Sequence, residues 1–167
     1  TKDGVIDLGN YVYPEVFDWD NDGFPDLLVG TIEGTINLIR NTGNTDQPIF
    51  EDPVPIEGIE TLMYPHPTMV DWDGDGLVDM LLGHREGTVL FYKNIGEPGK
   101  PKFESRGEVL KENGEQVEVY MLSHQCPVSW NDDGTYDLLV GKDSGQVVWF
   151  KNVGPQENPV FSEGEIL

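Results

Sequence analysis

The sequence predicts an all-β protein made of three β-propeller blades, each a four-stranded antiparallel sheet. The main observation is an acidic string, Asp-x-Asp-x-Asp-Gly-x-x-Asp, which starts at residues 18 and 71 and returns in a variant form at residue 129. Each copy continues into Leu-Leu-Val-Gly or Met-Leu-Leu-Gly, and the copies lie 53 and 58 residues apart. Short apolar runs between Gly, Asn and Pro turns indicate strands of about five residues, and no stretch has helical periodicity.

The first copy shows the order of elements that we expect in every blade. An inner strand at Glu15–Asp18 leads into the acidic loop, and a second strand follows at Asp26–Gly30. After a Glu-Gly turn, a third strand spans Thr35–Arg40. A Pro-x-Phe sequence then starts the fourth strand, at Phe50 in this copy. Four antiparallel strands in about 50 residues are typical of a propeller blade rather than of a sandwich.

Both ends of the chain align with the inside of a repeat. Residues 161–167 match residues 103–110, and residues 1–4 resemble residues 111–114. The expected blades are residues 1–56, 57–110 and 111–167, with the termini inside a fourth strand. Because propellers have about four to eight blades, three blades do not close a ring. We expect either a homo-oligomer in which chains share a ring or a longer propeller of which this chain is a part.

A formal net charge of −21 restricts the partners of the chain. Nucleic acids and anionic membranes bind proteins through basic patches, so neither is expected as a partner. No apolar run is long enough to cross a bilayer, so we expect no membrane insertion. Cys126 is the only cysteine, which excludes a disulfide scaffold. We expect its side chain to fill a small apolar space in a strand.

The acidic string concentrates four carboxylates within nine residues, which is repulsive unless a cation lies among them. Ca²⁺ prefers about six to eight oxygen ligands, and the glycine of the string allows the sharp turn that such a loop needs. An EF-hand would require flanking helices and a glutamate at position twelve, where this chain has Val29, Leu82 and Val140. The sequence therefore predicts calcium loops between strands, with a structural role for the ion.

Two of the three loops carry the full set of predicted calcium ligands. These ligands are Asp18, Asp20, Asp22 and Asp26 in the first loop and Asp71, Asp73, Asp75 and Asp79 in the second. The third loop offers Ser129, Asn131, Asp133 and Asp137, of which only the last two are carboxylates. Because the number of charged ligands tunes calcium affinity, the third loop is the weaker candidate.

The acidic string followed by Leu-Leu-Val-Gly resembles the FG-GAP/VCBS repeat family, and the resemblance extends over all three copies. It implies propellers of extracellular or cell-surface proteins, as in the heads of integrin α-subunits and in several bacterial polysaccharide lyases. It also implies calcium in the loop that joins the first two strands of a blade. The third copy departs from the family pattern at Ser129 and Asn131. The fold and the metal carry over from the family, whereas a function does not.

A second candidate site lies at the end of the hairpins opposite the acidic loops. If the ends of a loop pair symmetrically, a residue five positions before it faces one five positions after it. The resulting pairs are His66 with His84, His124 with Lys142, and Tyr13 with Thr31. All three histidines then occupy one level near the propeller axis, next to Arg85.

This central-face site is compatible with three functions. Our main prediction is an extracellular calcium-binding module that binds a glycan or a protein ligand there. One alternative is a polysaccharide lyase, because abstraction of a proton next to a carboxylate needs a cation to neutralise the acid and a His or Tyr to move protons. The resemblance to lyases implies His66 or His124 as the base, Tyr13 or Tyr64 as the acid, and Lys142 and Arg85 as uronate ligands. The other alternative is an architectural module that self-assembles, with the histidines as polar caps of strand ends.

Overall fold

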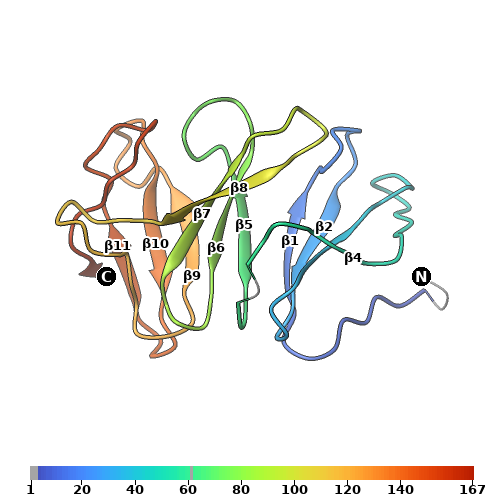
Figure 1. Ribbon diagram of the computed structural model, residues 1–167, viewed down its shortest axis with the longest axis horizontal. Helices are drawn as coiled ribbons and strands as arrows, with labels where there is room; N and C mark the ends of the chain where they lie inside the picture. The colour runs from blue at the N-terminus through green and yellow to red at the C-terminus, as the bar shows by residue number, and fades with distance from the viewer. Residues whose placement is uncertain (1–3, 61) are drawn as a thin grey trace.

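The computed structural model describes residues 4–60 and 62–167 and contains three four-stranded antiparallel sheets (Figure 1). The first sheet consists of β1 (Tyr13–Phe17), β2 (Asp26–Gly30), β3 (Ile36–Ile39) and β4 (Val54–Pro55). The second consists of β5 (His66–Val70), β6 (Asp79–Gly83), β7 (Val89–Asn94) and β8 (Phe103–Glu108). The third consists of β9 (His124–Val128), β10 (Asp137–Gly141), β11 (Val147–Phe150) and β12 (Glu165–Ile166). No helix occurs in the described residues, so the predicted all-β fold with three four-stranded sheets is confirmed.

The strands of each sheet follow one another in chain order, so that every connection joins neighbouring antiparallel strands. The second strand of the first blade, β2, has the bounds that the sequence predicted. The inner strand, β1, starts two residues before the predicted Glu15 and ends before Asp18. Asp18 leaves the strand because its carboxylate turns into the loop, where it accepts hydrogen bonds from the backbone N–H groups of Asp22 and Gly23.

The fourth strands differ from the prediction in two blades. β8 begins at Phe103 as expected, whereas β4 and β12 are two residues long and begin well after Phe50 and Phe161. Those two phenylalanines instead form isolated bridges with Asn41 and Asn152. The predicted match between residues 1–4 and 111–114 rests mainly on residues 1–3, which lie outside the described part of the chain.

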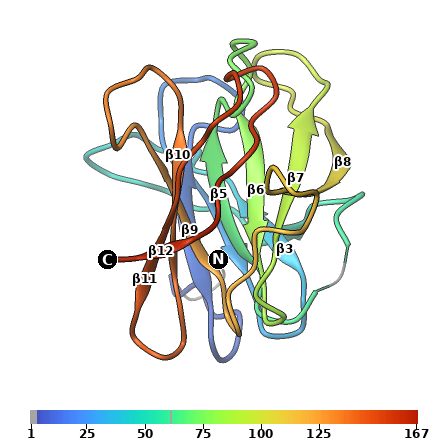
Figure 2. The same cartoon turned by 90° about the vertical axis from the view of Figure 1, so that its left-hand side faces the viewer.

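The three sheets stand side by side as blades, with their first strands innermost (Figures 1 and 2). β1 contacts β5, and β5 contacts β9. The fourth strands, β4, β8 and β12, form the opposite edge of each sheet. The connections β1–β2, β5–β6 and β9–β10, which contain the acidic loops, lie together at the upper edge of both views. The acidic loops and the starts of the inner strands are therefore at opposite ends of the blades.

Alternation along β6 supplies apolar side chains to both neighbouring blades. Met80 and Leu82 point toward the first sheet and pack with Leu28 and Ile36. Leu81 points the other way, into a cluster shared with the third sheet. Because successive strand residues face opposite sides, a strand between two blades is buried along its whole length. All five residues of β6 are buried accordingly.

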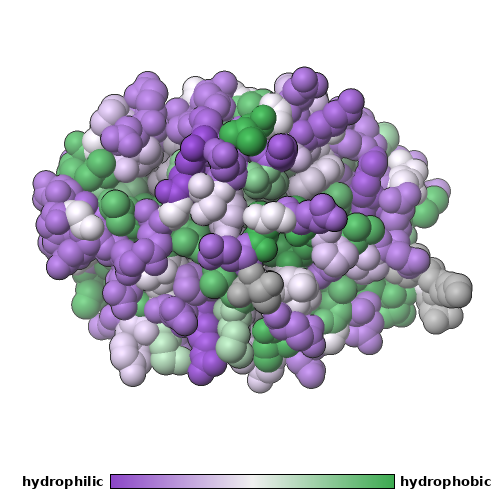
Figure 3. All heavy atoms as spheres, viewed as in Figure 1, coloured by the Kyte–Doolittle hydropathy of each residue, from purple (hydrophilic) through white to green (hydrophobic). Residues whose placement is uncertain are grey.

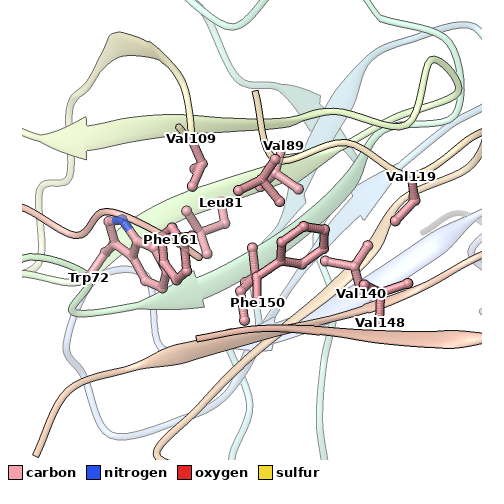
Figure 4. Packing of buried hydrophobic residues seen from close by; sticks show 11 residues of the cluster. Trp72, Leu81, Val89, Val109, Val119, Val140, Val148, Phe150 and Phe161 are labelled. Carbon is pink, nitrogen blue, oxygen red and sulfur yellow. The ribbon is translucent and has the colours of Figure 1, made fainter. Parts of the chain in front are cut away.

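The larger core lies between the second and third sheets (Figure 4). Trp72 stacks on Phe161, with ring centroids 5.8 Å apart, and both side chains are almost completely buried. Val117 and Val119, which precede β9, belong to this core, and their backbone N–H groups donate to the carbonyls of Val109 and Gly87 in the second blade. The core therefore joins the start of the second acidic loop to the start of the fourth-strand segment of the next blade.

Each of the two end blades has one sheet face that no described residue of another sheet covers. Val16 of β1 is 63% exposed, and Val147 of β11 is 42% exposed. Cys126 of β9 is also exposed, so the expectation that it fills a core space was wrong. Hydrophilic residues dominate the broad face between these ends, where apolar residues form scattered patches (Figure 3). Among the described residues, no helix is long and apolar enough to span a membrane.

Candidate functional site

Each acidic loop is a tight turn built by residues with positive φ. The fourth residue of the string has positive φ in every blade, as Asn21, Gly74 and Asp132. The glycine of the string, two residues later, has positive φ as well. Glycine, asparagine and aspartate adopt this conformation at the lowest energy, so the sequence of the string matches its backbone. The turn directs the carboxylates that alternate along it toward one region.

The last aspartate of the string holds the loop to the rest of its blade. Asp79 is fully buried, and its two carboxylate oxygens accept hydrogen bonds from the backbone N–H groups of Trp72 and Asn94, at 3.1 and 2.7 Å. Asp26 accepts the same two bonds in the first blade, from Trp19 and Asn41, at 2.9 and 2.7 Å. These contacts tie the start of the loop to the end of the third strand.

Carboxylates gather closely in the first two loops. Ligand oxygens of Asp18, Asp20 and Asp22 lie within 4.8 Å of one another. In the second loop the same holds for Asp71, Asp73 and Asp79. Asp26 and Asp75, which were predicted as ligands, are outside these two groups.

Several oxygens in these groups are buried without a hydrogen-bond partner among the described residues. They are Asp20 Oδ1, Asp71 Oδ1 and Asp73 Oδ1. Burial raises the pKa of Asp79 to about 6, and the nearby charge of Asp73 acts in the same direction. Buried carboxylate oxygens normally have a partner, so these atoms fit the ligand set of a hard cation. On this criterion the residues of both loops fit calcium.

A basic side chain from the end of the third strand reaches each of these two loops. Arg40 forms an ion pair with Asp20. Lys93 forms ion pairs with Asp73 and, at 2.8 Å, with Asp75. These hydrogen bonds raise the pKa of Lys93 above its usual value. Each loop thus has a cationic neighbour in its own blade.

The third loop is organised by neutral groups as well as by carboxylates. Asn131 accepts a hydrogen bond from the backbone N–H of Asp133, and Asp133 accepts two from Thr135. Asp137 accepts one from the N–H of Asn152, while its Oδ2 has no partner among the described residues. No group of three carboxylates or histidines is found in this loop among the described residues. Ser129 remains a predicted ligand without a described side-chain contact.

The cross-strand pairs at the other end of the hairpins differ from the prediction by one residue. His66 pairs with Gly83, His124 with Gly141, and Tyr13 with Gly30. The predicted partners were His84, Lys142 and Thr31, each one residue further along. The symmetric count was wrong because Asp71 already belongs to the loop, and the last pair of the hairpin is Val70 with Asp79. A shift of one residue turns a side chain to the opposite face of the sheet.

Three inner strands bring one aromatic cluster together, and we call Tyr11, Tyr13, Tyr64, His66 and His124 the inner-strand cluster. The ring centroid of His66 lies 3.6 Å from that of Tyr13 and 3.7 Å from that of His124. Tyr64 extends the cluster toward Tyr11, at 5.9 Å. The predicted clustering of Tyr13, His66 and His124 is therefore present.

Burial governs the protonation of this cluster. His66 is 7% exposed, and burial, with a smaller contribution from His124, lowers its pKa to about 3. Burial also lowers the pKa of His124 and raises that of Tyr13. Both histidines are thus favoured in the neutral form. The neutral rings present flat faces to a ligand. His66 Nε2 is in addition a buried polar atom without a partner among the described residues.

The structure places His84, Arg85 and Lys142 apart from the inner-strand cluster. His84 is buried in the turn after β6, where its Nε2 lies 2.9 Å from Thr88 Oγ1 and its Nδ1 accepts from the N–H of Glu86 at 3.4 Å. Arg85 donates to Met63. Lys142 contacts Gln146 in the turn after β10. His84 therefore has partners on both ring nitrogens and stabilises its turn.

Sequence reasoning assigned no role to the asparagine after Arg40, Lys93 and Lys151. Asn94 Oδ1 accepts hydrogen bonds from the N–H groups of Gly96 and Lys102, at 3.0 and 3.1 Å, and so bends the chain toward β8. Asn41 and Asn152 make the equivalent bonds in their blades. The recurrence of Asn-x-Gly in every copy was the available signal for this role.

Residues 18–82 match the family model of the FG-GAP-like repeat. This segment is similar to the FG-GAP-like repeat. The resemblance noted in the sequence is thereby confirmed for a segment that runs from the first acidic loop through most of β6. FG-GAP repeats form β-propellers, and the three four-stranded sheets are consistent with propeller blades. No match was found among curated proteins or among solved structures.

Proposed function

We propose that the chain is a calcium-binding β-propeller module that binds a glycan at its inner-strand cluster. The observation that carries the calcium part is the pair of carboxylate groups, each with at least one buried oxygen that has no partner in the described part of the chain. Calcium would be held by Asp18, Asp20 and Asp22 in the first loop and by Asp71, Asp73 and Asp79 in the second. When bound, it neutralises these carboxylates and stabilises the turn.

Calcium should stabilise the folded chain, because an ion that binds only the native state adds its binding free energy to that of folding. At about 100 times the dissociation constant this contribution is about 2.7 kcal/mol per site. We expect the melting temperature to rise when calcium replaces chelator, and to rise less in Asp73→Asn. Asp143→Asn, an exposed aspartate outside the loops, is the control and should respond like the parent protein. Equal melting curves with calcium and with chelator would contradict the calcium function.

The inner-strand cluster supports a glycan as the ligand. Tyr11 is 66% exposed, so its ring is available beside the half-buried Tyr13 and the buried His66. Tyrosine and histidine rings combine flat apolar faces with polar atoms at the edge. Such side chains suit a ligand that is itself amphipathic, such as a sugar ring. Tyr11 and Tyr64 both have positive φ, which a bulky residue adopts only at a cost in energy. Leu122 has the same backbone in the third blade, so this conformation belongs to the start of every inner strand.

Binding can be measured with an array of neutral and uronate-containing oligosaccharides. We expect Tyr11→Ala to weaken binding at least about tenfold, in keeping with the loss of a well-packed aromatic contact. Tyr120→Ala is the matched control, because Tyr120 is a tyrosine with 82% exposure and no ring contact with the cluster. Equal affinity of both variants and the parent protein would exclude this cluster as the glycan site.

The geometry supports binding better than the lyase alternative. A general base works best when its pKa is near the operating pH, and burial lowers the pKa of His66 to about 3. Arg85 and Lys142, the expected uronate ligands, have their contacts outside the cluster. Lyase activity would be visible as ultraviolet absorbance of unsaturated products from uronate-containing polysaccharides. We expect no such signal from the assembled protein.

We further propose that the module acts within a larger ring, outside the cell or at its surface. Three blades leave two sheet faces uncovered, and a closed propeller needs about four or more blades. Extracellular calcium-binding modules have dissociation constants of about 10⁻⁴–10⁻³ M, so a weak calcium site is sufficient in that environment. The solution mass distinguishes the sources of the missing blades. A calcium-loaded monomer of 18.7 kDa would count against ring sharing by identical chains, and with it against a purely self-assembling architectural role.

A further inference from the structure

A basic residue occupies the same position in all three blades, directly before the asparagine that lies at or just beyond the end of the third strand. These residues are Arg40, Lys93 and Lys151. In each blade the backbone N–H of that asparagine is held by the last aspartate of the acidic loop, at 2.7–2.8 Å. This hydrogen bond brings the basic residue next to the loop, whatever its side chain then does.

Arg40 and Lys93 use this position differently. Among the described residues, Arg40 forms an ion pair with a single loop aspartate, Asp20. Lys93 forms ion pairs with two, Asp73 and Asp75. The side chain of Lys93 is also less exposed than that of Arg40, at 24% against 40%. The basic side chain beside the second loop therefore occupies two of its aspartates, and that beside the first loop occupies one.

The difference between the loops appears at the third aspartate of the string. In the first loop Asp22 belongs to the close group of carboxylates, together with Asp18 and Asp20. In the second loop the equivalent residue, Asp75, is outside the group. Its Oδ2 is bound to Lys93, and its Oδ1 accepts a hydrogen bond from the N–H of Leu77 at 2.9 Å. Lys93 thus places its ammonium group between the carboxylates of Asp73 and Asp75, where a bound cation would otherwise contact both.

We infer that Lys93 competes with the divalent cation for Asp73 and Asp75 and so makes the second loop the weaker of the two calcium sites. This inference rests on the calcium function proposed above. A cation that uses all the aspartates of the second loop must draw Asp75 away from the ammonium group, and breaking those ion pairs opposes binding. Among the described residues Arg40 pairs only with Asp20 and leaves Asp22 within the carboxylate group, so calcium binding to the first loop breaks one ion pair instead of two. Lys93 is then a residue that sets affinity, without being a ligand.

Isothermal titration with calcium tests the inference on the full chain. Asp20→Asn weakens the first loop, so that the heat reports mainly on the second. In this background we expect Lys93→Gln to lower the dissociation constant about three- to tenfold, as expected for the loss of partly exposed ion pairs. Lys93→Arg retains the charge and should stay close to the background value. Lys102→Gln removes one charge from an exposed side chain of the same blade and should change the constant less than about twofold.

Thermal unfolding in chelator shows that each variant folds and adds a second readout. Lys93→Gln should unfold at a lower temperature than its background protein, because the carboxylates of the second loop then lose their counter-ion. A dissociation constant that is unchanged or higher in Lys93→Gln would overturn the inference alone. If all variants unfold cooperatively and none binds calcium, the calcium function fails and the inference fails with it.

Discussion

At the scale of single residues, His66 shows how burial selects a protonation state. Its imidazole is packed between Tyr13 and His124 and has an Nε2 atom without a partner among the described residues. Protonation would place a charge in this apolar contact, and so the pKa of His66 falls to about 3, below its usual value of 6.5. The unfolded chain has no such restriction. Folding is therefore coupled to the release of a proton from this residue.

The first prediction concerns the pH dependence of stability. Between about pH 6.5 and 3 the unfolded chain binds more protons at His66 than the folded chain, so the free energy of unfolding falls as the pH is lowered through this range. The slope from one such group is at most about 1.4 kcal/mol per pH unit. Asp79 acts in the opposite direction, because its pKa is raised from 3.8 to about 6. His66→Phe, measured by chemical denaturation against the parent protein, should remove the part that belongs to His66.

The comparison has an internal control at pH 7.5, where His66 is neutral in both states and the slope from it vanishes. At this pH the free energies of unfolding of the two proteins should differ only through the effect of the substitution on packing. Stability curves that run parallel from pH 7.5 to pH 4 would contradict the assigned pKa of His66.

At the scale of elements, the glycine that ends each second strand depends on the neighbouring blade. A Cβ atom at Gly30 would collide with the backbone carbonyl of Pro65, and one at Gly83 with the carbonyl of Ser123. At Gly141 the nearest atom would be the Cβ of its own strand partner His124, at 3.7 Å. The glycine is thus required where the next inner strand passes across the end of the hairpin. Gly141 lies where the described chain supplies no such strand.

The element-scale prediction compares the same substitution at two equivalent positions. Gly83→Ala should lower the free energy of unfolding by about 1–3 kcal/mol, because backbone atoms of Ser123 cannot move without shifting the inner strand. Gly141→Ala should leave it unchanged or raise it by up to about 1 kcal/mol, because the space is open and the unfolded chain loses entropy. Both values come from urea denaturation. A similar loss at both positions would mean that Gly141 is also covered.

The hairpins also show which element properties can be predicted from sequence. The bounds of β2 follow from four residues, Leu-Leu-Val-Gly, between an aspartate and a turn. The register of the next hairpin, β5–β6, was mispredicted by one residue, because the position at which the inner strand ends and the loop begins depends on the carboxylate of Asp71. That carboxylate caps the N–H of Gly76 at 3.0 Å instead of continuing the strand. Spacing alone does not reveal this hydrogen bond.

At the scale of the whole molecule, apolar side chains on facing sheets of neighbouring blades pack together, and their burial stabilises the fold. Leu81 is completely buried between the second and third sheets. Leu139 occupies the equivalent position in β10, on the face of the third sheet that no other described sheet covers, and is only partly buried. The same residue type thus has two environments in one chain.

The whole-molecule prediction uses this pair. Leu81→Ala should cost about 2–5 kcal/mol, since it leaves a cavity between two blades. Leu139→Ala should cost clearly less in a monomeric chain, because part of its side chain is already in contact with water. Denaturation and solution mass are measured together. Equal losses, combined with a lower mass for Leu139→Ala, would show that a second chain covers this face.

The sequence alone determined the number of blades, their second strands and the two acidic loops with their carboxylates. These are local properties, set by the period of the repeat, by turn residues with positive φ and by the alternation of apolar side chains. Only the tertiary structure decided which residues meet at the starts of the inner strands. Tyr13, His66 and His124 come together from three blades because β1, β5 and β9 pack in succession. His84 is excluded because a shift of one residue in the hairpin register puts it beyond the end of β6, where it bonds to its own turn.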